Sequence, residues 1–267
     1  MKETDFFLKE YPNCIYSLST PLWMKREVKG GAIMQSWLVK GSEVVLAIDS
    51  PCPEIPGFHS FIEENFKLPV IMLNTHGHID HIGCNKQFGK VYLAKEDWEL
   101  ASSGGVQINK EHISIEDIGY ECVDIPEGFK ISLGNRELIA HHIPGHTRGS
   151  VVVYEEATST LFGGDSVSRR ILYGLSDRTP LSKYLERLEY ISNLNTDYIY
   201  SSHDDFQLLS DMPKRIISNI TENIKKTNLI WTSPIDGRKF KRIVKGKSEE
   251  DLSYFDFVIP VDMESER

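Results

Sequence analysis

The stretch that decides the fold is "NTHGHIDHIG", residues 74–83, where four side chains that bind metals crowd into six positions. They are His76, His78, Asp80 and His81, in a chain of 267 residues with only nine histidines. Zinc binds imidazole nitrogen and carboxylate oxygen at about 2 Å in a near-tetrahedral arrangement, so a loop with the pattern H-x-H can turn both rings onto one ion. Gly77 is expected to relieve crowding there and to permit unusual backbone angles. Asp80 and His81 stand near the start of an expected helix and can serve a second ion.

Further polar residues follow apolar segments that have the length and composition of buried strands. Asp49 follows "VVLAI", His146 follows "LIAHHIPG", Asp165 follows "TLFGG" and His203 follows "YIYSS". In α/β proteins, ligands collect at the carboxyl ends of strands. The sequence therefore predicts that five separate segments, including the 76–81 run, deliver histidine and aspartate to one cleft.

This set of motifs resembles the metallo-β-lactamase fold superfamily, including its glyoxalase II type. The resemblance rests on the H-x-H-x-D-H run at 76–81, His146 in "PGHT", Asp165 in "GGDS" and His203 after a late strand, and it spans about residues 30–210. It implies an α/β fold, a four-layer αβ/βα sandwich with two mixed β-sheets flanked by helices and a metal site at the strand ends. The chain departs from the pattern at "SSHDD", where "PGHG" is usual, and at Cys84.

The resemblance also implies a ligand for each position of a two-metal site. His76, His78 and His146 would hold one ion, Asp80, His81 and His203 would hold the other, and Asp165 would bridge them. Asp49 matches an acidic residue at the end of an early strand and would fix a ligand histidine by hydrogen bonding. The expected cofactor is two zinc ions per chain, with iron and manganese left open because imidazole suits several metals.

Two zinc ions about 3.5–4 Å apart hold a water between them and bring its pKa toward neutrality. The expected enzyme is therefore a dinuclear metal-dependent hydrolase that uses a bridging hydroxide on a small ester, thioester, lactone or amide. Asp80 would ligate a metal and also take or relay a proton. The alternative is an oxidoreductase with one iron, similar to the persulfide dioxygenases on the same fold. Substrate selection is expected to lie in 101–135 and 166–183, with the C-terminal segment 211–267 left open.

The rest of the chain predicts a single domain over 1–267, with a core at about 30–210 and a C-terminal helix and strands at 211–267 that complete the fold. Helices are expected at 58–67 and 180–194, and a glycine-rich loop at 101–121. His141 and His142 are adjacent on a strand and point to opposite faces. Cys84 is read as a helix-packing residue, while Arg169 and Arg170 are read as solvated, with anion binding as the alternative.

The charge of the chain disfavours a nucleic-acid partner. The net charge is −9, and the one basic stretch, 237–247, is read as a strand pair with a turn. No run approaches the roughly 18 apolar residues of a membrane helix, and residues 1–13 lack the apolar core of a signal peptide. A cytoplasmic enzyme with a small-molecule substrate and no membrane partner is expected, with a homodimer left open.

Overall fold

The computed structural model describes residues 2, 4–24, 33–103, 118–174, 179–233, 237–247 and 251–263. Most of the loop predicted at 101–121 lies outside these residues. One seven-stranded sheet takes up the first half of the chain, with its strands in sequence order. The strands are β1 (Phe7–Tyr11), β2 (Ile15–Ser19), β3 (Ser36–Lys40), β4 (Val45–Ile48), β5 (Val70–Leu73), β6 (Lys90–Tyr92) and β7 (Glu121–Val123). The sheet is mixed, because β1 to β4 pair antiparallel and β4 to β7 pair parallel.

A second, five-stranded sheet has the order β13-β11-β10-β9-β8. Its strands are β8 (Phe129–Ser132), β9 (Glu137–His142), β10 (Val151–Glu155), β11 (Thr160–Gly164) and β13 (Tyr198–Ser201). The only parallel pair in it is β11 with β13, and the other pairs are antiparallel. Both sheets are therefore mixed, as predicted.

The C-terminal part forms a further sheet of four strands, which the sequence did not predict. Its order is β12-β16-β15-β14, with β12 (Arg170–Leu172), β14 (Ile230–Thr232), β15 (Lys239–Lys245) and β16 (Phe255–Pro260). The basic stretch at 237–247 contributes the one strand β15, not a strand pair. β15 pairs antiparallel with β14 on one side and with β16 on the other.

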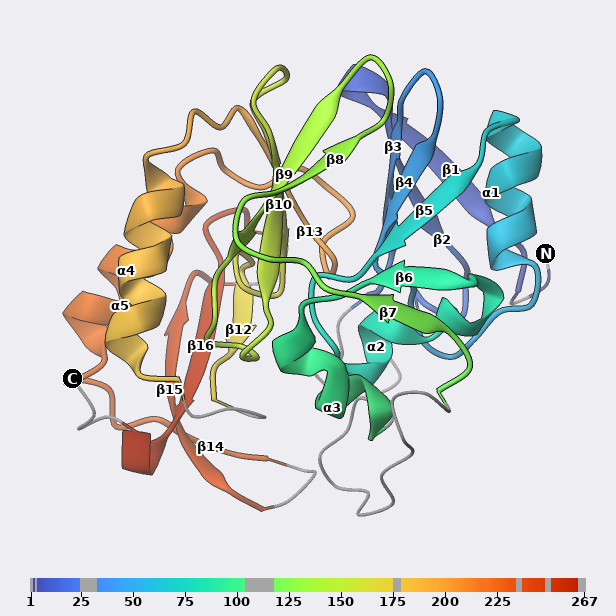
Figure 1. Cartoon of the computed structure of the whole chain (residues 1–267). Helices are drawn as coiled ribbons and strands as arrows, with labels where there is room; N and C mark the ends of the chain where they lie inside the picture. The colour runs from blue at the N-terminus through green and yellow to red at the C-terminus, as the bar shows by residue number, and fades with distance from the viewer. Residues whose placement is uncertain are drawn as a thin grey trace.

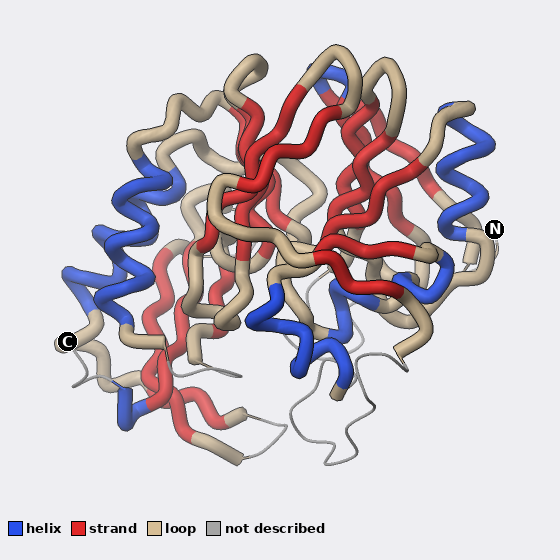
Figure 2. Tube along the Cα trace, viewed as in Figure 1, coloured by secondary structure: helices blue, strands red, loops and turns tan. Residues whose placement is uncertain are grey.

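Helices cover the outer faces of the sheets (Figures 1 and 2). The longer ones are α1 (Phe58–Phe66), α4 (Leu181–Ser192) and α5 (Met212–Asn223); α2 (Ile79–Ile82) and α3 (Trp98–Ser102) are short. Single 3₁₀ turns lie at Pro12–Cys14, Asn85–Gln87, Lys95–Asp97 and Val261–Met263. The predicted helices at 58–67 and 180–194 are present, whereas the helix expected after His81 ends at Ile82. Among the described residues, no helix is long and apolar enough to cross a membrane.

Alternation of side chains along the strands produces the layers. In β10, Val151 and Val153 face the core between the two large sheets, while Val152 and Tyr154 face α4 and α5. Residues i and i+2 of a strand lie on one face, so a strand buried on both faces is apolar throughout. A third core lies between α1 and the first sheet. The order helix, sheet, sheet, helix confirms the predicted four-layer architecture (Figure 2).

Candidate metal centre

The predicted ligands come from loops that follow strands of both large sheets. His76, His78, Asp80 and His81 follow β5 of the first sheet, and His146, Asp165 and His203 follow β9, β11 and β13 of the second. The structure brings all seven together, in three groups whose ligand atoms lie within 4.8 Å of one another. These groups are His76, His78 and His146; His76, His81 and Asp165; and Asp80, His81 and His203.

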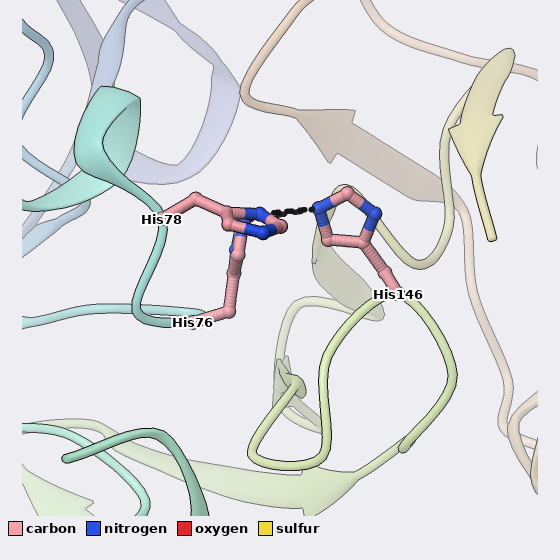
Figure 3. Close-up of side chains that lie close together, drawn as sticks. All are labelled: His76, His78 and His146. Carbon is pink, nitrogen blue, oxygen red and sulfur yellow. Dashed lines mark hydrogen bonds between the residues drawn. The ribbon is translucent and has the colours of Figure 1, made fainter. Parts of the chain in front are cut away.

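The first group consists of three imidazoles from two loops (Figure 3). The Nε2 atom of His146 lies 2.9 Å from Nδ1 of His78 and 3.2 Å from Nε2 of His76. Burial and the neighbouring histidines hold the pKa of His76 well below its ordinary value, and burial with His146 lowers the pKa of His78 to about 3. All three rings are nearly excluded from solvent. Neutral, converging ring nitrogens are the form of histidine that binds a metal.

The carboxylate of Asp165 lies between the first and the third group. Its Oδ2 atom lies 3.1 Å from Nε2 of His203, in the third group, and 3.5 Å from Nε2 of His146, in the first. Burial would raise the pKa of Asp165, but His203 and His81 outweigh it and lower the pKa well below its ordinary value. Asp80 Oδ2 lies 3.9 Å from Nε2 of both His81 and His203, and its side chain is 43% exposed. Asp80 is therefore accessible from solvent.

Two buried polar atoms at the junction fit a cation. His81 Nε2 and Asp165 Oδ1 lie 3.5 Å apart, and neither has a hydrogen-bond partner within the described ranges. A buried polar atom is ordinarily hydrogen-bonded. Since one of these atoms is a carboxylate oxygen and the other an imidazole nitrogen, this donor set suits a zinc, iron or manganese ion.

Hydrogen bonds on the far side of the rings fix which nitrogen faces the site. Nδ1 of His146 donates to the carbonyl oxygen of Leu172 at 2.8 Å, and Nδ1 of His203 donates to that of Ile33 at 2.9 Å. With the proton held at Nδ1, Nε2 is left as the basic atom toward the centre.

Asp49 holds the proton of His81 on Nδ1 in the same way, and it also connects several loops. It is fully buried, and its Oδ2 accepts from His81 Nδ1 and from Ser202 Oγ, each at 2.7 Å. Its Oδ1 accepts the Thr75 N–H at 2.7 Å, and the Thr75 hydroxyl also contacts His76 Nδ1 at 3.1 Å. One carboxylate therefore contacts His81 directly and the residues beside His76 and His203.

Asp97 is a positioning residue that the sequence reading missed. Its Oδ2 accepts from the Gly77 N–H and the Thr147 hydroxyl, and its Oδ1 accepts from the Gly149 N–H at 2.8 Å. It thereby fastens the H-x-H loop to the loop that carries His146. Asp97 also follows a strand, β6, so the strand-end pattern could have found it.

The close approach of Asp97 explains Gly77. A Cβ atom at this position would lie 2.9 Å from the Asp97 carbonyl oxygen and 3.1 Å from its Cβ. The predicted relief of crowding is thus present. The predicted unusual backbone angle is not, because Gly77 does not lie in the left-handed region.

The other residues considered in the sequence have structural contacts of their own. His141 contacts Glu127 and His142 donates to the carbonyl oxygen of Ile125, so neither approaches the ligands. Cys84 packs in the core under α1, where burial raises the pKa of its thiol to about 12. Arg169 is only 2% exposed, so the prediction that it is solvated is wrong.

A cavity of about 460 Å³ lies beside the His146 loop. It is lined by Glu96, Glu127, His142, Pro144, Arg148, Thr179, Lys183 and Arg187. Arg187 is already held by both carboxylate oxygens of Glu127, each at 3.0 Å. The lining therefore carries three basic residues, Arg148, Lys183 and Arg187, and two acidic ones, Glu96 and Glu127.

Comparison with known proteins gives the same family by several routes. The model of the metallo-beta-lactamase superfamily matches residues 67–203. Acyl-coenzyme A thioesterase MBLAC2 of Homo sapiens is 25% identical over 201 residues, covering 64% of this chain and 72% of that protein. A hydroxyacylglutathione hydrolase of Synechocystis sp. is 33% identical over 103 residues, covering 37% of this chain and 36% of that protein.

Solved structures agree on the fold. A metallo-beta-lactamase from Pontibacter korlensis has a TM-score of 0.63 at 18% identity and covers 82% of this chain and 100% of its own. The metallo-beta-lactamase FIM-1 from Pseudomonas aeruginosa, in a mono-zinc form, has a TM-score of 0.60 at 14% identity, covering 81% and 95%. The relatives named above are hydrolases, as the sequence predicted for this chain. The family match over half of the chain, the fold and the relatives together show that this protein is an enzyme of the metallo-β-lactamase superfamily.

Proposed function

We propose that this protein is a dinuclear metal-dependent hydrolase of thioesters. The observation that carries the proposal is the position of Asp165 between two ligand groups: its Oδ2 lies 3.5 Å from His146 Nε2 in one and 3.1 Å from His203 Nε2 in the other. Among the substrates left open by the sequence, thioesters are favoured because both kinds of curated relative act on them: acyl-coenzyme A in one case and hydroxyacylglutathione in the other.

In this proposal, His76, His78 and His146 would hold one ion, Asp80, His81 and His203 would hold the second, and Asp165 would serve both. Bound zinc would supply an activated water and a positive charge for the developing oxyanion, and iron or manganese would serve the same ligands. Two zinc ions per chain is the expected loading.

The chain's own residues supply positioning and proton transfer. Asp49 keeps the proton of His81 on Nδ1, and Asp97 holds the two histidine-bearing loops together. Asp80 is the candidate proton acceptor, because its half-exposed carboxylate can be reached by the attacking water. Cleavage of the C–S bond then releases a thiol and a carboxylic acid. The cytoplasmic location and the homodimer stay predictions.

The test begins with metal content by mass spectrometry on protein purified without added metal. Thiol release from acyl-coenzyme A and hydroxyacylglutathione thioesters is then followed with a thiol reagent. About two zinc ions and thiol release support the proposal, whereas about one iron and oxygen uptake with a persulfide support the dioxygenase alternative. The assignment is wrong if neither zinc, manganese nor iron restores metal binding to the stripped protein.

A matched pair of variants links activity to the centre. His146→Ala removes a ligand, and His141→Ala removes another buried histidine, from the strand leading into the same loop. We expect His146→Ala to lose at least 100-fold in kcat/KM and His141→Ala to retain activity within a few-fold. Equal losses in the two variants would count against a metal role for His146.

A further inference from the structure

Arg169, in the loop after β11, is a buried charged side chain near the centre that has no role in the proposed function. Its Nε and Nη2 atoms donate to Oδ1 of Asp204, at 2.9 and 2.5 Å. Its Nη1 donates to the carbonyl oxygen of Asp251 at 3.0 Å, and the guanidinium lies 4.6 Å from the ring centre of Phe206. Arg169 and the Asp204 side chain are 2% and 5% exposed, so this is an ion pair within the protein and not an anion site on its surface.

Both partners stand next to ligands of the second metal position. Asp204 directly follows His203, and Arg169 comes four residues after Asp165 in the loop between β11 and β12. The pair therefore joins the loop that carries the bridging carboxylate to the loop that carries the last histidine.

Other contacts hold Asp204 from the opposite side. Its Oδ2 accepts from Ser201 Oγ at 2.7 Å, and its carbonyl oxygen accepts from the side chain of Gln35. Together with Ser202, which donates to Asp49, every residue of "SSHD" at 201–204 is tied to a neighbour. This accounts for the departure from the usual "PGHG": side chains fix the histidine loop here.

We propose that Arg169 and Asp204 form a positioning pair that sets His203 against Asp165 and thereby sets the affinity of the second metal position. The inference rests on the proposed dinuclear function. It predicts a selective effect, because Asp204 follows His203 directly, whereas His76, His78 and His146 come from the loops after β5 and β9. Partners of metal ligands commonly change metal affinity by 10- to 100-fold when they are mutated.

The test compares Arg169→Met with Arg136→Met. Arg136 forms a similarly buried pair with Glu155 at the far end of β10, and Arg136 Nε donates to Glu155 Oε1 at 2.6 Å. Zinc binding is measured for each full-length variant by competition with a chelator, beside the thermal unfolding of the metal-free protein. We expect both variants to unfold at lower temperature. Only Arg169→Met should weaken the second zinc at least tenfold while the first binds as in the wild type.

A second variant, Asp204→Asn, keeps the test decisive if Arg169→Met fails to fold. Asp204→Asn keeps the shape of the side chain and removes its charge, and Co²⁺ substitution reports the coordination of the second position by its visible absorption. If Arg169→Met and Asp204→Asn both bind two zinc ions with wild-type affinity and show the wild-type Co²⁺ spectrum, the pair has only a structural role. Failure of the wild type to bind a second ion would instead refute the dinuclear function, which separates the two hypotheses.

Discussion

Replacing Asp49 with Asn tests how much one carboxylate contributes to the metal centre. Asp49 has a φ of 62°, in the left-handed region where Asn is also tolerated, so the backbone need not change. Both carboxylate oxygens of Asp49 accept hydrogen bonds, so the NH₂ group of Asn would face another N–H donor in either orientation of the amide. Placed at Oδ1 it meets the N–H of Thr75, and placed at Oδ2 it meets the Nδ1 proton of His81.

The second orientation moves the proton of His81 to Nε2, the atom that faces the centre. Loss of a charge-assisted hydrogen bond costs about 1.5–3 kcal/mol, and a 10- to 100-fold loss of metal affinity corresponds to about 1.4–2.8 kcal/mol. We therefore expect Asp49→Asn to weaken the second zinc by 10- to 100-fold in a chelator competition. The unfolding temperature of the metal-free protein should fall by only several degrees.

Ser202→Ala is the matched control for this change. It removes one of the donors to Asp49 and leaves the His81 contact in place. We expect its second zinc to weaken less than tenfold. If Asp49→Asn bound both ions as tightly as the wild type, the tautomer argument would fail.

Three further changes probe other parts of the centre. His203→Ala should bind one zinc instead of two, because the group of His76, His78 and His146 stays complete; loss of both ions on dialysis would contradict the grouping. Asp97→Asn should leave one N–H of Gly77 or Gly149 facing the amide nitrogen, which costs about 1–3 kcal/mol; calorimetric unfolding checks this, and an unchanged unfolding temperature would rule out the tether. Lys183→Ala should raise KM for an acyl-coenzyme A thioester about three- to tenfold at low salt, with kcat unchanged and the effect reduced at high salt. Lys130→Ala, which removes a surface lysine paired with Glu137, is its control and should leave KM unchanged in steady-state assays.

Local pattern was sufficient to bring the candidate ligands together, and the family resemblance supplied the four layers. The ligands each follow an apolar strand, and strand ends meet at one edge whatever the loops between them do. Similarly, the apolar face of 180–194 predicted α4, in which Tyr184, Leu188 and Ile191 are buried.

What the sequence did not disclose depends on partners far along the chain. Arginines are mostly exposed in proteins, so Arg169 was assigned to the surface; its burial is decided by Asp204, 35 residues later. The tether at Asp97 likewise depends on Gly77 and Gly149, which only the folded chain brings to it. The third sheet was missed because β12 has three residues and pairs with the distant strand β16, where Arg170 lies opposite Asp256.

The candidate ligands are divided between the two large sheets, so ions bound there would link the two halves of the sandwich. His76, His78, Asp80 and His81 belong to one half, and His146, Asp165 and His203 belong to the other. Ions that bind only the assembled site add their binding free energy to the cohesion of the halves. Metal loading should therefore slow amide hydrogen exchange in β5 and in β11 together, far beyond the residues that touch the ions. Loss of metal in a metal-poor environment would then expose the enzyme to unfolding and proteolysis as well as to loss of catalysis.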